Sequence, residues 1–431
     1  MAGRTVVVVV VVLAALVFAD QAFVGLLPNG SLAIKPEHGQ HVLVDGVVFR
    51  VLVDRLEQLA TQVQTQAQQL DGLEAQVETL TNQLDGLETQ VETLTNQLDG
   101  LQCMAVATTI TIPGVSGAGS FFWVGGVLAG NGKIYGIPFY SASVLIIDPT
   151  TNTADTTTLT GLGGNDKWAG GVLAGNGKIY GIPCSSASVL IIDPTTNSTD
   201  TTTITGLGND VYKWWNGVLG GNGKIYGIPH TSASVLIIDP TTNTADTTTL
   251  TGLSGGSVKW SGGVVAGNGK IYGIPFDSAS VLIIDPTTNT TDTTTITGLS
   301  GAIHKWCGGV VAGNGKIYGI PCSSASVLII DPTTNTTDTT TIMGFSGVYK
   351  WHGGVLVGDG RIYGIPLTSA SVLIIDPTTN TVDTTTLMGL GGGYKWYGSV
   401  VAGNGKIYGI PYDLAAVLIA QQVCNAIVKG L

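Results

Sequence analysis

The pattern of apolar and polar positions divides this chain of 431 residues into two regions. In the first, which ends at about residue 101, apolar residues recur every three or four positions over 49–101, which is a helical spacing. In the second, a unit of 45 to 46 residues repeats, and each copy begins with a Trp. The unit that begins at Trp260 holds four short β-type runs, separated by Gly-Asn-Gly, Pro and Asp-Pro-Thr-Thr-Asn. Four strands per unit at this period predict a β-propeller blade.

Seven units can be counted, and the last one is incomplete. The units begin at Trp123, Trp168, Trp214, Trp260, Trp306, Trp351 and Trp396. The Asp-Pro-Thr-Thr-Asn turn occurs only six times, at Asp148, Asp193, Asp239, Asp285, Asp331 and Asp376. The seventh unit ends after the run 416–420 without a Thr-rich fourth run, and such a run stands instead at 107–112, before the first Trp. We therefore expect an all-β, seven-bladed propeller over 103–431, in which the N-terminal strand completes the last blade and removes its free edge.

The repeated segments resemble a known class of propeller. Gly-Lys-Ile-Tyr, a Ser-rich turn and Val-Leu-Ile-Ile-Asp-Pro-Thr-Thr-Asn-Thr are similar to kelch-type and YVTN-type repeats, over about three quarters of the chain. The copies depart from kelch repeats in two ways: no Gly-Gly follows the Tyr run, and no Trp follows the Asp-Pro turn. The resemblance implies a protein that binds partners, although a fold does not dictate a function.

Residues 49–101 form a heptad array. Position a is occupied by Phe49, Leu56, Val63, Leu70, Val77, Leu84, Val91 and Leu98, and position d by Leu52, Leu59, Gln66, Leu73, Leu80, Leu87, Leu94 and Leu101. This pattern predicts a parallel coiled coil, roughly 80 Å long. A long helix packed on the propeller is a weaker interpretation, because a strict seven-residue repeat specifies a helical partner. No Lys or Arg lies between 56 and 101, so no salt bridges select between two and three chains.

The N-terminal segment predicts export. A basic start, seven valines from Val6 to Val12 and small residues before Asp20 are typical of a signal peptide, here 1–19. A retained signal anchor is the alternative, although the apolar run of about 15 residues is short of the ~20 that span a bilayer. Residues 20–48 are a lead-in segment, in which 42–49 could form a hairpin or Asp45 could cap the following helix.

The charge lies mostly outside the propeller. Residues 1–102 hold 4 basic and 12 acidic residues, and the rest of the chain holds 14 and 17, which together give the net charge of −11. A nearly neutral propeller gives no reason to expect nucleic-acid binding.

Differences between the copies predict a binding surface on one face of the ring. The Gly-Asn-Gly and Asp-Pro turns hardly vary and share one face, so the variable loops share the other. With Asn-Gly as a two-residue hairpin turn, the residue after each Trp lies opposite the residue after each Pro. The resulting candidates for ligand binding are Trp215, His230, Phe139, Phe276, His352, Tyr397, Tyr412 and Asp277, with Asp166, Asp210, Tyr212, His304, Tyr349 and Tyr394 from neighbouring loops. Exposed aromatic residues favour recognition, whereas drift at tolerant positions is the alternative.

The cysteines and sequons add expectations for an exported protein. Cys103 and Cys424 flank the blade that lacks its turn, and we predict a disulfide between them. Cys307 and Cys322 lie in one hairpin as a possible second disulfide, whereas Cys184 is left over. Asn29, Asn197, Asn289 and Asn335 stand in glycosylation sequons, which Thr-rich repeats also generate by chance.

No catalytic motif is found, and we expect no enzyme, no metal and no cofactor. The region 103–431 contains no Glu and a single Arg, Arg361. An unusual hydrolase site could only be built from Asp277, Asp413, His230 and tyrosines.

The sequence thus predicts a secreted or surface-displayed recognition protein that self-associates as a dimer or trimer and binds an extracellular protein or glycan. It would contact a membrane only through a retained N-terminal segment. A coat or wall spacer without a specific ligand is the alternative.

Overall fold

The computed structural model describes the backbone of residues 23–26, 32–35, 42–44, 46–99, 101–111, 121–254 and 258–426. Side chains are described over 58–92, 106–111, 121–254 and 258–421. The predicted signal peptide 1–19 and Asn29 lie outside the described residues. The chain forms two compact units, Met1–Leu101 with Ile427–Leu431, and Gln102–Ala426.

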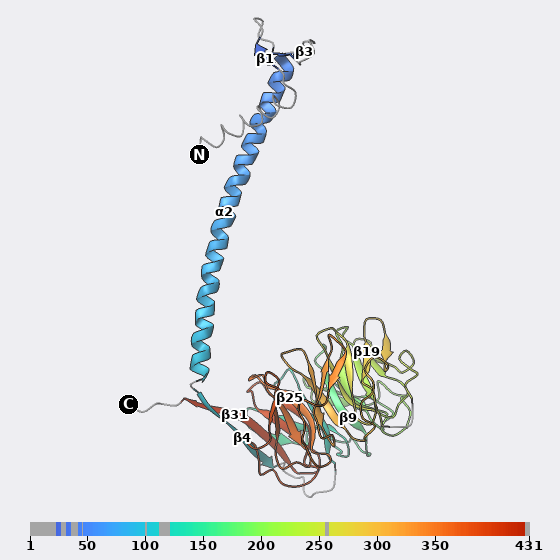
Figure 1. The fold of residues 1–431 in the computed structure, drawn as a ribbon. Helices are drawn as coiled ribbons and strands as arrows, with labels where there is room; N and C mark the ends of the chain where they lie inside the picture. Colours follow the sequence, from blue (N-terminus) through green and yellow to red (C-terminus); the bar gives the residue numbers. More distant parts are fainter. Residues whose placement is uncertain are drawn as a thin grey trace, which may run out of the picture. The chain divides into compact units, whose positions relative to one another are not determined.

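The first unit contains a small sheet and one long helix (Figure 1). Strands β1 (Phe23–Leu26), β2 (Leu32–Lys35) and β3 (Val42–Val44) form an antiparallel sheet in that order. Helix α2 follows over Gly46–Asp99. The predicted helix is confirmed, but the alternative hairpin over 42–49 is wrong, because β3 pairs with β2 and the helix begins directly after it. Asp45 lies outside the described residues. Within the part of the chain that the structure describes, no helix has the length and apolar character needed to cross a membrane.

An apolar stripe runs along α2. Its members, all at the a and d positions of the heptads, are Leu59, Val63, Leu70, Leu73, Val77, Leu80, Leu84, Leu87 and Val91. Each side chain is between 52% and 63% exposed. Leu and Val at this exposure, repeated along several helical turns, are an apolar face that water contacts in the single chain.

The second unit consists of seven antiparallel sheets of four strands, as predicted. The first strands are β5 (Trp123–Leu128), β9 (Trp168–Leu173), β13 (Trp214–Leu219), β17 (Trp260–Val265), β21 (Trp306–Val311), β25 (Trp351–Leu356) and β29 (Trp396–Val401). The second strands are β6 (Ile134–Pro138), β10 (Ile179–Pro183), β14 (Ile225–Pro229), β18 (Ile271–Pro275), β22 (Ile317–Pro321), β26 (Ile362–Pro366) and β30 (Ile407–Pro411).

The outer half of each blade consists of the third and fourth strands. The third strands are β7 (Leu145–Asp148), β11 (Leu190–Asp193), β15 (Leu236–Asp239), β19 (Leu282–Asp285), β23 (Leu328–Asp331), β27 (Leu373–Asp376) and the longer β31 (Ala416–Ala426). The fourth strands are β8 (Thr153–Asp155), β12 (Ser198–Asp200), β16 (Thr244–Asp246), β20 (Thr290–Asp292), β24 (Thr336–Asp338), β28 (Thr381–Asp383) and, for the last blade, β4 (Leu101–Thr111).

The ring is closed by the N-terminal strand. Strand β4 is hydrogen-bonded to β31 in the sheet β29-β30-β31-β4, and the two lie side by side in Figure 1. Ile110 of β4 packs against the cluster that contains Val417 and Ile419 of β31. Each first strand contacts the next one around the ring, and β29 contacts β5. The predicted closure is therefore confirmed.

The fourth strand lies earlier than predicted. The Thr-rich run after Asp155 is not a strand, and the strand is the three residues that precede it. The carboxylate of Asp155 accepts hydrogen bonds from the backbone N–H of Thr157 and the hydroxyls of Thr157 and Thr158, which turns the chain out of the sheet. Leu159 then enters the core, where it is 3% exposed.

The hairpin between the first two strands also differs from the prediction. Its turn has three residues, Gly130 to Gly132, because the N–H of Ala129 donates to the carbonyl of Lys133 and Gly132 takes a φ of 78°. The register then shifts again between Trp123 and Gly126. The residues after Trp and after Pro are therefore not direct strand partners, and the predicted pairing is wrong.

A ring of residues with left-handed backbone lies where this register shift occurs. It consists of Gly125, Gly170, Asn216, Gly262, Gly308, Gly353 and Gly398, with φ between 63° and 86°. The backbones approach closely, since a Cβ at Gly398 would lie 3.3 Å from the Cα of Gly125. Glycine is required because it tolerates both this φ and this approach, and Asn, at position 216, is among the residues that tolerate this φ best.

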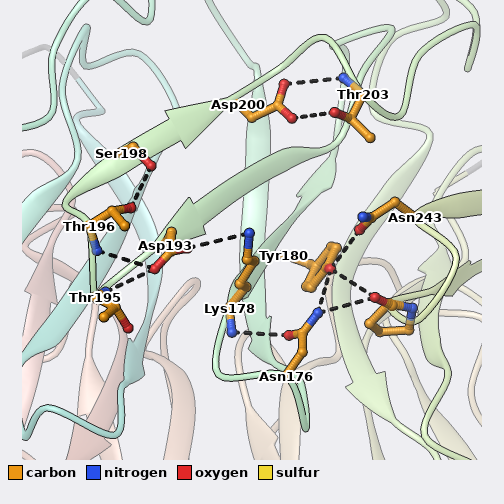
Figure 2. A network of polar contacts seen from close by, with 11 residues as sticks. Asn176, Lys178, Tyr180, Asp193, Thr195, Thr196, Ser198, Asp200, Thr203 and Asn243 are labelled. Atoms are coloured by element: carbon orange, nitrogen blue, oxygen red, sulfur yellow. Dashed lines mark hydrogen bonds and ion pairs between the residues drawn. The ribbon is translucent and has the colours of Figure 1, made fainter.

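Polar contacts join neighbouring blades at the opposite edge (Figure 2). Asn176 donates to Tyr180 and to the carbonyl of Pro240, and Tyr180 donates to Asn243 in the following blade. Across the closure, Tyr408 donates to Asn152 at 2.8 Å, and Asn404 donates to the carbonyl of Pro149 at 3.0 Å. The hydrogen bond from this Asn to a Pro carbonyl of the following blade occurs six times, and the last of these bonds joins the seventh blade to the first.

The blade before the incomplete one departs from this pattern. It carries Asp359 where the other blades have Asn, and Tyr363 donates to that carboxylate at 3.0 Å. The next blade has no Asp-Pro turn to receive an Asn, because its fourth strand comes from β4. The missing turn therefore explains the single exception.

We predict that Gly398→Ala destabilises the ring by about 1–3 kcal/mol, because a side chain there is strained by a φ of 83° and crowds the Gly125 backbone. Gly403→Ala in the same blade is the matched control, since a Cβ there meets nothing within 4 Å. Chemical denaturation of both variants measures the difference. Equal stability of the two variants would contradict the close approach of the first strands.

Candidate functional site

The two kinds of turn lie on opposite edges of the ring, as predicted. On one edge, named here the invariant face, the Gly-Asn-Gly and Asp-Pro turns are joined by ion pairs such as Lys178–Asp193 at 3.3 Å. These pairs are partly exposed and add little stability. On the other edge, named the variable face, the loops after the second and fourth strands meet, as when Tyr140, after β6, donates to Asp166, after β8.

Six lysines form a buried layer beneath the variable face, which we call the lysine ring. They are Lys167, Lys213, Lys259, Lys305, Lys350 and Lys395, each between 2% and 5% exposed. Their ammonium groups donate to backbone carbonyls rather than to carboxylates: Nζ of Lys167 donates to Phe139 of the preceding blade and to Gly164 of its own loop. Each also lies over the following Trp, at 5.7 to 5.9 Å. The lysine ring therefore fixes the loops of the variable face to one another.

Sequence reasoning missed the lysine ring, although a signal was present. The dipeptide Lys-Trp occurs in six of the seven units, and Phe122 replaces the lysine in the first. Lysine is rarely buried, so an exposed position was the natural expectation. Burial lowers the pKa of Lys167, Lys259, Lys350 and Lys395 to about 8.

The predicted ligand-binding residues lie together, but most are less exposed than expected. Phe139, Trp215, His230 and His352 are buried, and Phe276, Asp277, Tyr397 and Tyr412 are half-buried. The prediction that these side chains form an exposed surface is therefore wrong for the first four. The cause is the register shift after each Trp, together with the close approach of the first strands at the glycine ring. Side chains at these positions fill the space around the axis.

Aromatic rings meet across the axis in what we call the axial cluster, made of Phe139, Trp215, His352, Tyr397 and Tyr412. Trp215 contacts Phe139 at 5.7 Å and Tyr397 at 5.8 Å between ring centroids, although the three come from different blades. Tyr397 also contacts Tyr412 at 4.8 Å and His352 at 3.3 Å. The cluster is therefore a layer shared by distant blades.

The two histidines here are buried differently. Nδ1 of His230 is hydrogen-bonded to the carbonyl of Trp260 at 2.8 Å, and burial lowers its pKa to about 4. Both ring nitrogens of His352 lack a hydrogen-bond partner among the described residues, and burial lowers its pKa well below the usual value. An unpaired buried polar group is costly, so His352, together with Ser399 of β29, is an exception among the buried polar side chains that the structure describes.

A second set of side chains surrounds this layer nearer to solvent, and we call it the aromatic rim. It consists of Phe121, Tyr140, Asp166, Tyr212, His304, Tyr349 and Tyr394, and all except Tyr140 have positive φ. Ring contacts run between successive members, from Tyr349 to His304 at 4.9 Å and to Tyr394 at 5.9 Å. Tyr212 and Tyr394 are 36% and 40% exposed. The rim is therefore the accessible part of the predicted surface.

Asp166 is the centre of the polar contacts in the rim. Tyr140 donates to Oδ2 at 3.3 Å, and Tyr212 donates to Oδ1 at 3.2 Å. Burial and the Asp166 carboxylate raise the pKa of Tyr140, and they raise that of Tyr212 to about 12. On the far side of the rim, Asp277 accepts from the backbone N–H of His304 at 2.5 Å.

The disulfide that the sequence left as a possibility is present. Cys307 and Cys322 are bonded, with their Cα atoms 5.3 Å apart. Cys184 is buried and free, and burial raises the pKa of its thiol to about 12. Cys103 and Cys424 belong to the neighbouring strands β4 and β31, but their side chains lie outside the described ones, so this disulfide stays a prediction. Asn197, Asn289 and Asn335 are exposed on the invariant face, and their glycosylation also stays a prediction.

The cavities described on the invariant face are small and polar. One of about 150 Å³ is lined by Lys270, Asp285, Asp292 and Asn335, and a similar one of about 130 Å³ lies in the preceding blade. Their carboxylates already accept hydrogen bonds from neighbouring threonines. Among the described residues, no group of three or more His, Cys, Asp or Glu could hold a metal ion.

Comparison with known proteins supports the architecture. No family model matches the chain, and no curated protein matches its sequence; the likeness to kelch-type and YVTN-type repeats therefore stays a resemblance. Among solved structures, virginiamycin B lyase of Staphylococcus aureus is similar, with a TM-score of 0.58 and 10% identity over 74% of this chain and 99% of that one. The extracellular domain of a one-component system of B. thetaiotaomicron has a TM-score of 0.54 and 10% identity, over 73% of this chain and 40% of that one.

A third structure, the extracellular domain of a hybrid two-component system of B. thetaiotaomicron, has a TM-score of 0.51 and 11% identity, over 72% of this chain and 41% of that one. At such low identity these likenesses show the propeller fold alone. One similar structure is an enzyme and two are extracellular domains, so the fold is compatible with either role.

The buried lysines predict how stability depends on pH. Unfolded lysine has a pKa near 10.4, so between about pH 8 and 10 the unfolded chain binds more protons at these lysines than the folded chain does. The free energy of unfolding should therefore rise with pH, most clearly in the lower half of this window. Cys184 opposes the rise with a single proton above about pH 8.5, and tyrosines whose pKa burial raises, such as Tyr212, oppose it as the pH nears 10. Denaturation at about pH 8, 8.5 and 9 measures the slope, and Lys395→Met should reduce it. A flat or falling profile would contradict the burial of these ammonium groups.

Proposed function

We propose that this protein is a secreted or surface-displayed recognition protein, in which helix α2 joins copies of the chain and the propeller binds an extracellular protein or glycan through the aromatic rim. The observation that carries the proposal is the rim itself. Four bulky aromatic residues, Phe121, Tyr212, Tyr349 and Tyr394, adopt left-handed backbone with φ between 37° and 56°. Such residues cost of order 1–3 kcal/mol each and gather at ligand clamps and other functional sites.

The composition of the rim fits recognition. Tyr and Trp are enriched among the residues that dominate the binding energy of interfaces, and they bury a large area at a low cost in side-chain entropy. Drift at tolerant positions would supply small polar residues as readily as tyrosines. The axial cluster supports the rim from below, so the rim side chains rest on a packed layer rather than on a flexible loop.

Self-association through α2 is the second part of the proposal. The exposed Leu and Val stripe is the face that a coiled coil buries, and further copies of this chain carry the same heptads. In a parallel arrangement, Glu88 at position e meets Gln83 at position g of the neighbouring helix, so like charges do not oppose each other there. A parallel dimer or trimer follows, and it would make several propellers available to one target.

Export agrees with three features. A signal-like segment begins the sequence, Cys307 and Cys322 form a disulfide, and two of the structures with a similar fold are extracellular domains. Disulfides persist mainly in oxidising compartments. No catalytic step is part of the proposal, and a panel of esterase and glycosidase substrates tests the alternative site of Asp277, Asp413 and His230.

We predict that replacing Tyr212 and Tyr394 together by Ala lowers binding to a protein or glycan array at least about tenfold, because the exposed rim anchors are lost. Met343→Ala with Met388→Ala is the matched control, since both methionines are more than 60% exposed but lie outside the rim. Unchanged binding by the tyrosine variant would reject the rim as the binding surface. Absence of any binding by the unaltered protein would favour a coat or wall spacer.

We predict that the full chain sediments as a dimer or trimer and that Leu73→Asp with Leu80→Asp yields monomers, because two carboxylates would enter the apolar seam. Asn82→Asp, at an outer heptad position, adds charge without entering the seam and should leave the mass unchanged. Analytical ultracentrifugation distinguishes these outcomes. A monomeric unaltered protein would contradict the coiled coil.

A further inference from the structure

The charges on the variable face have one sign where solvent can reach them. In the loops that form this face, the acidic residues are Asp166, Asp210, Asp277 and Asp413, and there is no Glu or Arg. The lysines there are the six of the lysine ring, which are buried and donate to carbonyls. The exposed lysines, such as Lys133 and Lys178, belong to the invariant face. The potential above the variable face is therefore set by carboxylates.

The carboxylate of Asp166 lies among aromatic side chains. Tyr140 and Tyr212 both donate to Asp166. Phe121 contacts Tyr140 at 5.8 Å and is stacked on Tyr412 at 4.8 Å, and Tyr212 lies 6.3 Å from Trp215. Asp166, Tyr140 and Tyr212 are only partly buried and stand on different blades, so the group can be reached from solvent.

The electrostatic effect of Asp166 extends over this group. The pKa of Tyr140, Tyr212 and Tyr412 is raised, by burial first and by the Asp166 carboxylate in addition. A negative field that opposes phenolate formation favours a cation in the same place. The faces of Phe and Tyr rings carry negative electrostatic potential and attract ammonium groups as well.

We propose that the rim around Asp166, with Phe121, Tyr140 and Tyr212, binds an organic cation of the alkylammonium class. The inference rests on the proposed function, because it assigns a ligand chemistry to part of the same rim. Carboxylate, sulfate or phosphate ligands are disfavoured, since the described residues of this face include no accessible Lys or Arg. The cation can belong to a small molecule such as choline or to a methylated lysine of a protein, and both present the same chemistry.

The test uses the full chain and compares choline with 3,3-dimethylbutan-1-ol, which has the same shape without the charge. Isothermal titration calorimetry should show binding of choline and at least about tenfold weaker binding of the alcohol. Asp166→Asn should weaken choline binding about fivefold or more. Asp210→Asn removes the same charge from a neighbouring loop and should change it less than about twofold.

Two further variants separate the ring from its hydroxyl. Tyr212→Phe keeps the aromatic face and should retain most of the choline affinity, whereas Tyr212→Ala should lose it.

A peptide with trimethyl-lysine, compared with the same peptide with norleucine, distinguishes a protein source of the cation. Binding of this peptide without binding of free choline would support the inference with a protein as the partner.

Equal binding of choline and its neutral analogue, or no binding of any cation, would overturn the inference. Absence of choline binding together with binding of a neutral glycan that is unchanged in Asp166→Asn would also overturn the inference, but it would leave the proposed recognition function intact. Conversely, Asp166→Asn could abolish choline binding while replacement of Tyr212 and Tyr394 leaves binding to the array unchanged. This result would reject the proposed function but not the cation site.

Discussion

The backbone hydrogen bonds between β31 and β4 are the constraint on which the rest of the structure depends. They join a strand that precedes all seven Trp units to a strand that follows them, so the last blade gains its fourth strand and the ring gains its closure. The same junction is held by Tyr408 and Asn404, which donate to the first Asp-Pro turn. Without closure the first and last blades would expose their sides, and exposed strand edges invite aggregation.

Closure also determines the chemistry of the variable face. Seven first strands around one axis leave so little room that left-handed glycines and Asn216 must stand where they approach. The shift in register there directs the next side chains toward the axis, where Phe139, Trp215 and Tyr397 pack. The lysine ring holds the loops above them. The aromatic rim is thus supported by a packed layer that no single blade could provide.

The sequence predicted the blades, the closing strand, the separation of the two faces and the long helix, because each depends on repetition within the chain. It did not predict the burial of His230 and His352, because that depends on a three-residue turn and a second register shift that local turn propensities do not specify. The lysine ring was missed because a charged residue is ordinarily exposed, and here backbone carbonyls of the neighbouring blade replace water around the ammonium group. The sequence therefore predicted which face of the ring carries the candidate site, but not how deeply its side chains are buried.

The measurement that tests closure most directly is native-state hydrogen exchange of β4 and β31, followed by mass spectrometry. If β4 completes the last blade, the amides of 107–111 that face β31 are protected, and they open together with those of 417–420 under increasing denaturant. Rapid exchange of 107–111, at the rate of an unpaired chain, while 417–420 stay protected would contradict the closed ring.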